Sequence, residues 1–544
     1  MMLRTTSRLT TATGATPKRI PKRATATAVA LAATTLALGA PVAGAKDDHG
    51  GPGGHRHFTP GAPGVGDRYY PLAGNGGYDV RHYDIDGRYD PATDVWTATT
   101  VVSARATQDL SRFDLDFDGM TIRTLTVNGH AASYSRNGGE LVVTPRHPVR
   151  RGTDLVVRVS YTGVPREFAL PIGGGNSLRT GFMATDDGAT VAGQPDVAAG
   201  WFPVNDHPRD KATYAFHVKV PTGLGVVANG VLKRTSSSKG WTRFDWRADE
   251  PMASYLATID IGRWDVRRWT TTSGLPVYDA VDPDLVADPV YGPSIDASLA
   301  RQGEVLDVLG AAFGRYPFGT VGAIVDDQPD LFFALETQTR PVYSKYFWPD
   351  GGDFVVAHEL AHQWYGDDVA LHDWQDIWLN EGWATYAEWV WAEHEGLFTP
   401  QDVFADAYAG IPADDPFWSF VVGQPPADDL FGNPVYLRGA MTLQVLRNRV
   451  GDTAFWQIAR DWVRERGGGT GTTAQFIALA ERVSGQQLDD LFDAWLFTGS
   501  KPTVTGLAAA ARSGSALAGR TLDTSLAVRS WQGAFDRRVA TGRY

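Results

Sequence analysis

Two histidines and a glutamate within one five-residue motif are the side chains of this 544-residue chain best placed to do chemistry. His358 and His362 lie four residues apart in VVAHELAHQW, a stretch with the apolar pattern of a helix. Because four residues make about one helical turn, both imidazoles can reach one metal ion. Glu359 lies beside that face, where a carboxylate can take a proton from a metal-bound water. The motif predicts a metal-dependent hydrolytic centre, although a buried helix can also hold two structural histidines.

A third candidate ligand, Glu381, is separated from His362 by eighteen residues and stands in WLNEGWATYAEW. Asn380 is a favourable N-cap residue, so we expect Glu381 to open a second helix that packs on the first. A carboxylate among so many apolar residues is costly to bury unless a cation compensates its charge. Two histidines and one glutamate give Zn²⁺ three protein ligands and leave one position open, as in catalytic sites. We therefore predict one zinc ion per chain, bound by His358, His362 and Glu381.

The two motifs together resemble those of a known family. HELAHQWYGD (358–367) followed by WLNEGWATYAEW (378–389) is similar to the aminopeptidase N family of gluzincin zinc metallopeptidases. The resemblance covers roughly residues 78–502, and FPVNDHPRDKATY (202–214) and PMASYLA (251–257) resemble the N-terminal β-domain of that family. It implies a zinc aminopeptidase whose substrates are peptides with a free N-terminus.

The resemblance also implies roles for individual residues. His358, His362 and Glu381 correspond to the zinc ligands, and Glu359 corresponds to the general base that activates the water. Tyr436, in VYLRGA, matches the tyrosine that donates a hydrogen bond to the transition-state oxyanion. Zinc in such a site lowers the pKa of its water to about 7 and polarises the scissile carbonyl.

Two more positions concern the substrate amine. FALET (333–337) stands where the family usually has GAMEN, on the edge strand that pairs with the peptide. Glu336 matches the acid that binds the free α-ammonium, whereas Phe333 and Thr337 depart from the family pattern. Gln194, in GQPD, is aligned with a Gln or Glu that assists amine binding. The resemblance therefore implies that Glu336 and Gln194 bind substrate.

Two rival interpretations remain open. A secreted zinc endopeptidase of the thermolysin type would use the same three ligands and would cleave blocked or internal peptides. The ALETQ sequence on an edge strand argues against that interpretation. A non-enzymatic surface-binding relative of the family would need to have lost a ligand or the base, and none of these residues is missing.

The elements that must position these groups are of two kinds. Over residues 69–264, apolar residues alternate with polar ones in stretches such as 113–117 and 157–161, which predicts strands. Asn-Gly pairs, which favour hairpin turns, recur there at 128–129, 137–138 and 229–230. These short strands without intervening helices indicate an all-β sandwich or saddle domain. Further strands are expected at 214–220 and 255–261.

The pattern changes from residue 265 onward. Helical patterns cover 354–366, 380–394 and 437–450, and strand-like stretches occupy 321–325 and 331–335. Residues 265–502 are therefore predicted to form a thermolysin-like α/β catalytic domain. The chain as a whole is expected to be a multidomain α+β protein.

Three terminal segments are predicted to lie outside these domains. Residues 1–45 have a basic start, a weakly apolar run and the small-residue sequence Ala43-Gly44-Ala45, the order of a secretory signal peptide. Residues 46–68, rich in Gly, Pro and His, are predicted to be a flexible leader, and residues 503–544 a poorly ordered tail. We therefore expect a secreted, extracellular protein with no stable membrane insertion once the signal is cleaved.

Composition excludes several function classes. The chain has no cysteine, so it is neither a thiol enzyme nor a disulfide scaffold. Its formal charge of −12 becomes −18 when the six basic residues of the signal segment are removed, which argues against nucleic acid as a partner. The 18 tryptophans require burial and exclude a disordered chain.

Overall fold

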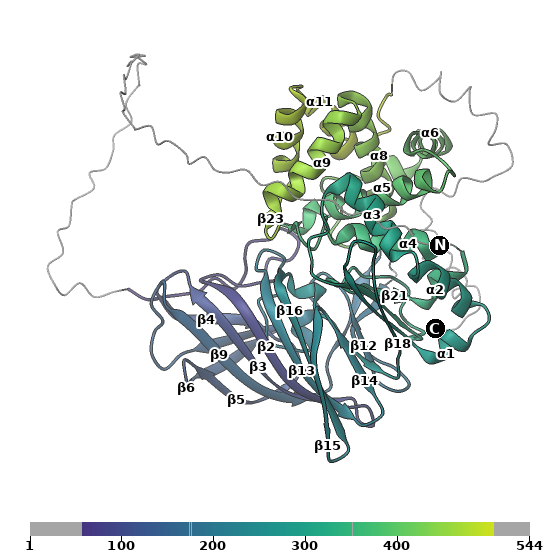
Figure 1. Cartoon of the computed structure of the whole chain (residues 1–544). Helices are drawn as coiled ribbons and strands as arrows, with labels where there is room; N and C mark the ends of the chain where they lie inside the picture. Colours follow the sequence, from purple (N-terminus) through teal and green to yellow (C-terminus); the bar gives the residue numbers. More distant parts are fainter. Residues whose placement is uncertain (1–56, 173–174, 176, 351, 505–544) are drawn as a thin grey trace, which may run out of the picture. The chain divides into compact units, whose positions relative to one another are not determined.

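The computed structural model describes residues 57–172, 175, 177–350 and 352–504 (Figure 1). The predicted signal peptide (1–45), the leader up to residue 56 and the tail from residue 505 lie outside the described residues. Among those that are described, no helix is both long enough and apolar enough to cross a membrane.

The first part of the described chain is almost entirely β (purple to teal in Figure 1). Its largest sheet has eight strands in the order β15-β16-β13-β2-β3-β9-β5-β6. In chain order these are β2 (Tyr78–Asp90), β3 (Val95–Ala106), β5 (Thr121–Val127), β6 (His130–Ala131), β9 (Asp154–Gly163), β13 (Ala212–Pro221), β15 (Val231–Ser238) and β16 (Trp241–Met252). Alternate residues of β9 are buried, as a half-buried strand requires.

Two smaller sheets complete the β-rich part. One has the order β1-β4-β8-β7, and the other has the order β10-β11-β12-β17-β14. The first contains β1 (Thr59–Pro60), β4 (Leu110–Asp116), β7 (Ser133–Asn137) and β8 (Glu140–Thr144). The second contains β10 (Glu167–Pro171), β11 (Ser177–Ala184), β12 (Ala189–Ala192), β14 (Gly225–Ala228) and β17 (Ile259–Gly262).

The second part combines a small sheet with helices. Its four strands, in the order β18-β19-β20-β21, are β18 (Asp265–Thr270), β19 (Pro276–Val281), β20 (Val321–Asp326) and β21 (Val342–Ser344). A second, two-stranded sheet joins β22 (Ala370–Leu371) to β23 (Thr470–Gly471). The helices are α1 (Pro283–Ala287), α2 (Tyr291–Leu299), α3 (Gln302–Phe313), α4 (Gly352–His362), α5 (Trp378–His394), α6 (Pro400–Gly410), α7 (Pro416–Ser419), α8 (Asn433–Val450), α9 (Asp452–Arg466), α10 (Thr473–Ser484) and α11 (Asp489–Phe492). The expected order of a β-rich part before a helical one is confirmed, and the predicted boundary at residue 265 falls at the start of β18.

Two glycines allow α5 and α8 to pack closely. A Cβ atom on Gly382 would lie 3.0 Å from the carbonyl carbon of Gly439, and one on Gly439 would lie 3.0 Å from the Cα of Gly382. Larger residues would push the two helix backbones apart. The helix that carries Glu381 is thereby held against the helix that carries Tyr436.

The structure differs from the sequence prediction at several elements. Residues 331–335 form no strand, and their one ladder contact is a bridge between Leu335 and Val342. Residues 254–256 form a 3₁₀ turn, so the strand predicted at 255–261 is reduced to β17. The Asn-Gly pair at 229–230 makes no hairpin, because β14 and β15 on either side of it belong to different sheets.

Part of the predicted leader has a defined structure. Thr59–Pro60 pairs with β4 in parallel, and Asp67 is 2% exposed. The sequence prediction differs here because Gly-rich and Pro-rich composition indicates only the flexibility of the local backbone. Pairing with β4 is a tertiary contact, which composition does not indicate.

Candidate metal centre and active site

The three predicted metal ligands converge at the interface of two buried helices. His358 and His362 lie on the last turns of α4, and Glu381 lies in the first turn of α5. The Nε2 atoms of His358 and His362 are 3.4 and 3.3 Å from the same Oε2 atom of Glu381. The three ligand atoms all lie within 4.8 Å of one another, and all three residues are buried.

The other nitrogen of each imidazole is already occupied. His358 Nδ1 is 2.7 Å from Glu388 Oε1, and His362 Nδ1 is 3.0 Å from the carbonyl oxygen of Tyr365. Because these oxygens accept, each Nδ1 carries a proton and each Nε2 faces the shared centre, where it can give a lone pair to a metal ion. Two imidazole nitrogens and one carboxylate held in this way are the donor set that Zn²⁺ prefers, so the residues present fit a zinc ion.

The buried carboxylates of the cluster favour the binding of a cation. Burial raises the pKa of Glu381, but the combined effect of His362 and His358 outweighs burial and lowers this pKa to about 2. Burial lowers the pKa of His362, yet Glu381 and Glu336 raise it to about 9. Without a metal, protons on the imidazoles therefore compensate the buried carboxylates. A divalent cation bound by these residues would displace those protons and take over their role.

Glu359 and Glu336 lie next to this triad. A carboxylate oxygen of each lies within 4.8 Å of the other and of a His362 ring nitrogen, and both residues are buried. Burial raises the pKa of Glu359 to about 8, against the opposing effect of His358 and His362. The structure thus brings the predicted base and the predicted amine-binding acid to the same place.

One contact from the β-rich part and one from the residue after α4 hold Glu336 in position. Its Oε1 accepts a hydrogen bond of 3.0 Å from the hydroxyl of Tyr255, and its backbone carbonyl accepts one of 3.1 Å from Gln363 Nε2. Burial and the nearby Glu336 raise the pKa of Tyr255 well above its usual value, so the phenol keeps its proton and donates. The segment that carries Glu336 is irregular backbone, which corrects the expectation that it lies on an edge strand.

Tyr436 approaches the cluster from a third helix. It is the fourth residue of α8, and its ring lies 6.1 Å from the His358 ring at an interplanar angle of 24°. Burial, followed by the charges of Glu381, Glu336 and Glu359, raises its pKa well above the usual value. The hydroxyl therefore remains a proton donor at neutral pH.

Gln194 is less firmly connected to the site. It follows β12 and is 9% exposed, and its Oε1 has no hydrogen-bond partner among the described residues. Its predicted role in amine binding stays a prediction, and the buried acceptor oxygen, without a partner in the described part of the chain, is the feature that would suit it.

Sequence reasoning missed several residues of the site. Glu388 stands seven residues after Glu381, two helical turns on the same face, and this spacing could have identified it. Tyr255 lies in the PMASYLA segment, but nothing in the sequence indicates its contact with Glu336. Asn380 does not cap α5 as predicted, because the 3₁₀ turn Trp374–Asp376 leads directly into a helix that begins at Trp378.

Comparison with known proteins agrees with this arrangement. The model of the peptidase M1 N-terminal domain matches residues 80–256, and the model of the peptidase family M1 domain matches residues 353–495. Glutamyl aminopeptidase of Sus scrofa is 24% identical over 455 residues, which cover 76% of this chain and 46% of that relative. Aminopeptidase M1 of Arabidopsis thaliana is 24% identical and covers 57% of this chain and 37% of that relative. The chain thus spans less than half the length of these curated relatives.

Solved structures match over more of their length. The M1 zinc metallopeptidase from Deinococcus radiodurans is 28% identical with a TM-score of 0.70, over 82% of this chain and 99% of that chain. A mutant of that protein bound to a Tyr-Ser-Ala substrate gives a TM-score of 0.72 at the same identity and the same coverage of both chains. With both family domains in order, and two histidines and a glutamate placed for zinc, the chain belongs to peptidase family M1, the aminopeptidase N family of gluzincin zinc metallopeptidases.

Proposed function

We propose that this chain is a secreted zinc aminopeptidase that hydrolyses N-terminal residues from peptides, with Glu359 as the general base. One observation carries the proposal beyond metal binding: a second buried carboxylate, Glu336, lies beside Glu359 and His362. A free α-amine is cationic below its pKa of about 8 and needs an anionic partner when it is desolvated. Glu336 provides that partner next to the base.

His358, His362 and Glu381 would hold the zinc ion. When bound, zinc supplies Lewis-acid polarisation of the scissile carbonyl and lowers the pKa of a water molecule. Glu388 and the Tyr365 carbonyl keep both imidazoles turned toward the ion.

Glu359 would accept a proton from the attacking water and return it to the leaving amine. A pKa near the working pH suits a group that must both take and release a proton. In the metal-free site, burial raises the pKa of Glu359 to about 8 against the opposing effect of His358 and His362. Its carboxylate lies close to His362, one of the three residues that would hold the metal.

Tyr436 would stabilise the oxyanion that develops on the scissile carbonyl. Its proton is retained because burial and three nearby carboxylates disfavour the phenolate and hold its pKa high. A preorganised donor of this kind acts where charge appears in the transition state.

The test compares substrates with and without a free amine. The wild-type protein should contain one zinc ion and should hydrolyse free aminoacyl amides far better than their N-acetylated forms. Glu336→Ala should lose roughly 2–5 kcal/mol of transition-state binding on free substrates, because the ammonium is then buried without a partner. Glu336→Gln, which keeps the shape but not the charge, should lose activity in the same way. Zinc content should remain unchanged in both variants.

A different outcome would support a zinc endopeptidase. Vigorous wild-type cleavage of N-acetylated peptides, unaffected by Glu336→Ala, would overturn the aminopeptidase proposal. Absence of hydrolysis in a zinc-loaded protein would support the non-enzymatic interpretation.

Export is a separate part of the proposal, supported by the residue pattern of 1–45. Expression of the full chain in a secreting host should place the protein in the medium with a new N-terminus close to Lys46. Retention of the intact N-terminus in the cell fraction would contradict this part and leave the enzymatic part unaffected.

A further inference from the structure

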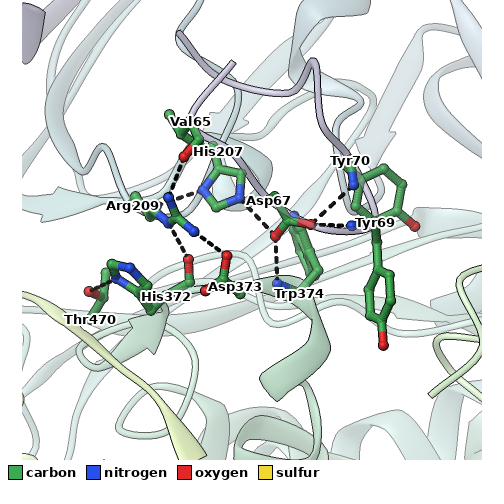
Figure 2. A network of polar contacts seen from close by, with 10 residues as sticks. All are labelled: Val65, Asp67, Tyr69, Tyr70, His207, Arg209, His372, Asp373, Trp374 and Thr470. Atoms are coloured by element: carbon green, nitrogen blue, oxygen red, sulfur yellow. Dashed lines mark hydrogen bonds and ion pairs between the residues drawn. The ribbon is translucent and has the colours of Figure 1, made fainter. Parts of the chain in front are cut away.

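A short segment before β2 contacts the residues that precede α5, the helix that carries Glu381. We call residues 65–70 the strap. Figure 2 shows that it lies between two other regions, around His207 and Arg209 and around His372 to Trp374. These three regions are more than a hundred residues apart in the sequence, so the strap joins parts of the chain that have no local reason to meet.

Asp67 is the centre of the strap's contacts. Its Oδ1 accepts hydrogen bonds from the backbone N–H groups of Tyr69 and Tyr70, at 2.7 and 3.0 Å. Its Oδ2 accepts from the N–H of Trp374 at 2.9 Å and faces His207 Nε2 at 3.2 Å. Both oxygens are therefore fully used in a side chain with no exposed surface.

The partner histidine is neutral. His207 Nδ1 accepts from the backbone N–H of Arg209 at 3.2 Å, so its proton sits on Nε2 and points to Asp67. Burial lowers the pKa of His207, which agrees with this assignment. Asp67 is thus a buried anion balanced by four N–H donors rather than by a cation.

Arg209 fastens the strap from the other side. Its Nε donates to the carbonyl of His372 and one terminal nitrogen donates to the carbonyl of Val65, each at 2.6 Å. The other terminal nitrogen pairs with Asp373. One side chain thus binds the strap and the residues that precede Trp374 together (Figure 2).

The strap leads through aromatic contacts to the amine-binding carboxylate. The Trp374 ring, which is fully buried, meets the Tyr70 ring edge-on at 6.2 Å and the Tyr255 ring at 5.4 Å. The Tyr255 hydroxyl in turn donates to Glu336 at 3.0 Å. Asp67 therefore holds the backbone of Trp374 in place. The Trp374 ring packs against the Tyr255 ring, and the Tyr255 hydroxyl orients Glu336.

We propose that Asp67 is a positioning residue for recognition of the substrate amine, acting through Trp374 and Tyr255 on Glu336. The inference rests on the proposed aminopeptidase function and adds to it a segment that composition alone assigns to a linker. The Asp67 side chain has no exposed surface, so its effect falls on the placement of Glu336 and therefore on KM for substrates with a free amine.

The direct test is Asp67→Asn with Asp376→Asn as its matched control. An asparagine at 67 would place an amide NH₂ against two N–H donors, because both carboxylate oxygens are in use. Asp376 is buried at the same helix start, but its Oδ1 alone accepts from the N–H and hydroxyl of Thr473, and its Oδ2 has no partner. Asparagine can keep both of those bonds, so Asp376→Asn should behave like the wild type.

Asp67→Asn should raise KM for free aminoacyl amides about ten- to a hundredfold, the scale of a displaced positioning group. Zinc content should remain at one ion per chain and kcat should change much less. The dissociation constant of an unblocked dipeptide, measured by calorimetry in a Glu359→Gln background, should rise by the same factor. An unchanged KM, or loss of zinc in parallel, would overturn the proposal, since the strap would then be inert or would act on α5 itself.

A double-mutant cycle tests the route. Tyr255→Phe removes the hydroxyl that orients Glu336, so adding Asp67→Asn to it should raise KM little further. Multiplicative effects would overturn the route through Tyr255. If Asp67→Asn does not fold, Tyr70→Leu, which withdraws the strap's ring from Trp374, should raise KM in the same direction, and an unchanged KM would overturn the proposal.

The same series separates the two claims. A wild-type protein that cleaves free and acetylated substrates equally well overturns the proposed function and the inference with it. A wild type that prefers the free amine, together with an Asp67→Asn variant of unchanged KM, overturns the inference alone.

Discussion

The metal-binding side and the amine-binding side of the site are built in different ways. The metal ligands and Glu359 come from two helices, α4 and α5, within one stretch of sequence. The amine side takes Glu336 from irregular backbone and Tyr255 from a 3₁₀ turn of the β-rich part. Helical repeat fixes His358, Glu359 and His362 locally and the packing of α5 on α4 adds Glu381, whereas the second group depends entirely on contacts between distant segments. The metal side should therefore tolerate distant changes that disturb the amine side.

The largest expected effect lies on the metal side and separates binding from catalysis. Glu359→Gln removes the base but no ligand, so zinc content should stay at one per chain while kcat falls roughly 10²–10⁴-fold. Metal analysis and steady-state kinetics of the same preparation would check this. Near-normal turnover would show that Glu359 is not the base.

Tyr436→Phe sharpens the comparison, because this residue comes from a third helix. Loss of one oxyanion donor should reduce kcat roughly 10²–10³-fold with little change in KM. Kinetics over a range of substrate concentrations separates the two constants. A change in KM alone would assign Tyr436 to packing or substrate binding.

Glu388→Gln tests how far the metal side depends on its outer contacts. Gln can present an amide NH₂ instead of an acceptor to His358 Nδ1, so the imidazole loses its fixed orientation. Zinc affinity should fall about 10- to 100-fold, as measured by competition with a chromogenic chelator. Unchanged affinity would mean that the helix alone orients His358.

The last prediction concerns the pH dependence of zinc affinity, whose effect is the smallest when it is counted per pH unit. Burial lowers the pKa of His362, but Glu381 and Glu336 raise it to about 9, so below that pH the metal-free imidazole holds a proton that zinc must displace. Affinity should therefore increase as pH rises toward about 9, by at most about tenfold per pH unit for each proton released. The chelator assay repeated across pH gives the slope, and a flat profile would contradict the raised pKa.

Much of the site could be predicted because its chemistry repeats at helical spacing. His358, Glu359, His362 and Glu381 lie where their sequence motifs place them, and the three predicted ligands are close enough together to hold one ion. The order of a β-rich part and a helical part followed from alternation and helical periodicity.

The parts that could not be predicted depend on contacts between distant segments. The strand expected at 331–335 is absent: only Leu335 pairs, with Val342, and the Leu331 carbonyl accepts from the Ser344 hydroxyl instead of from a ladder N–H. The burial of Asp67 could not be predicted, because a single acid in a Gly-rich segment is usually exposed to solvent. Only the structure shows the four N–H donors that surround its carboxylate. Tyr255 is similar, since nothing near it in the sequence indicates an acid 81 residues away.

The paired glycines between α5 and α8 bear on how this sequence can vary. Gly382 directly follows a zinc-site glutamate, and Gly439 lies three residues after Tyr436, yet neither carries a functional group. A methyl group at either position would press on the facing backbone at 3.0 Å, so the helix that carries Glu381 and the helix that carries Tyr436 would have to move slightly apart. In a library that randomises both helices, selection for turnover should therefore favour glycine at these two positions. The needs of this active site include two places where the absence of a side chain sets the spacing of its helices.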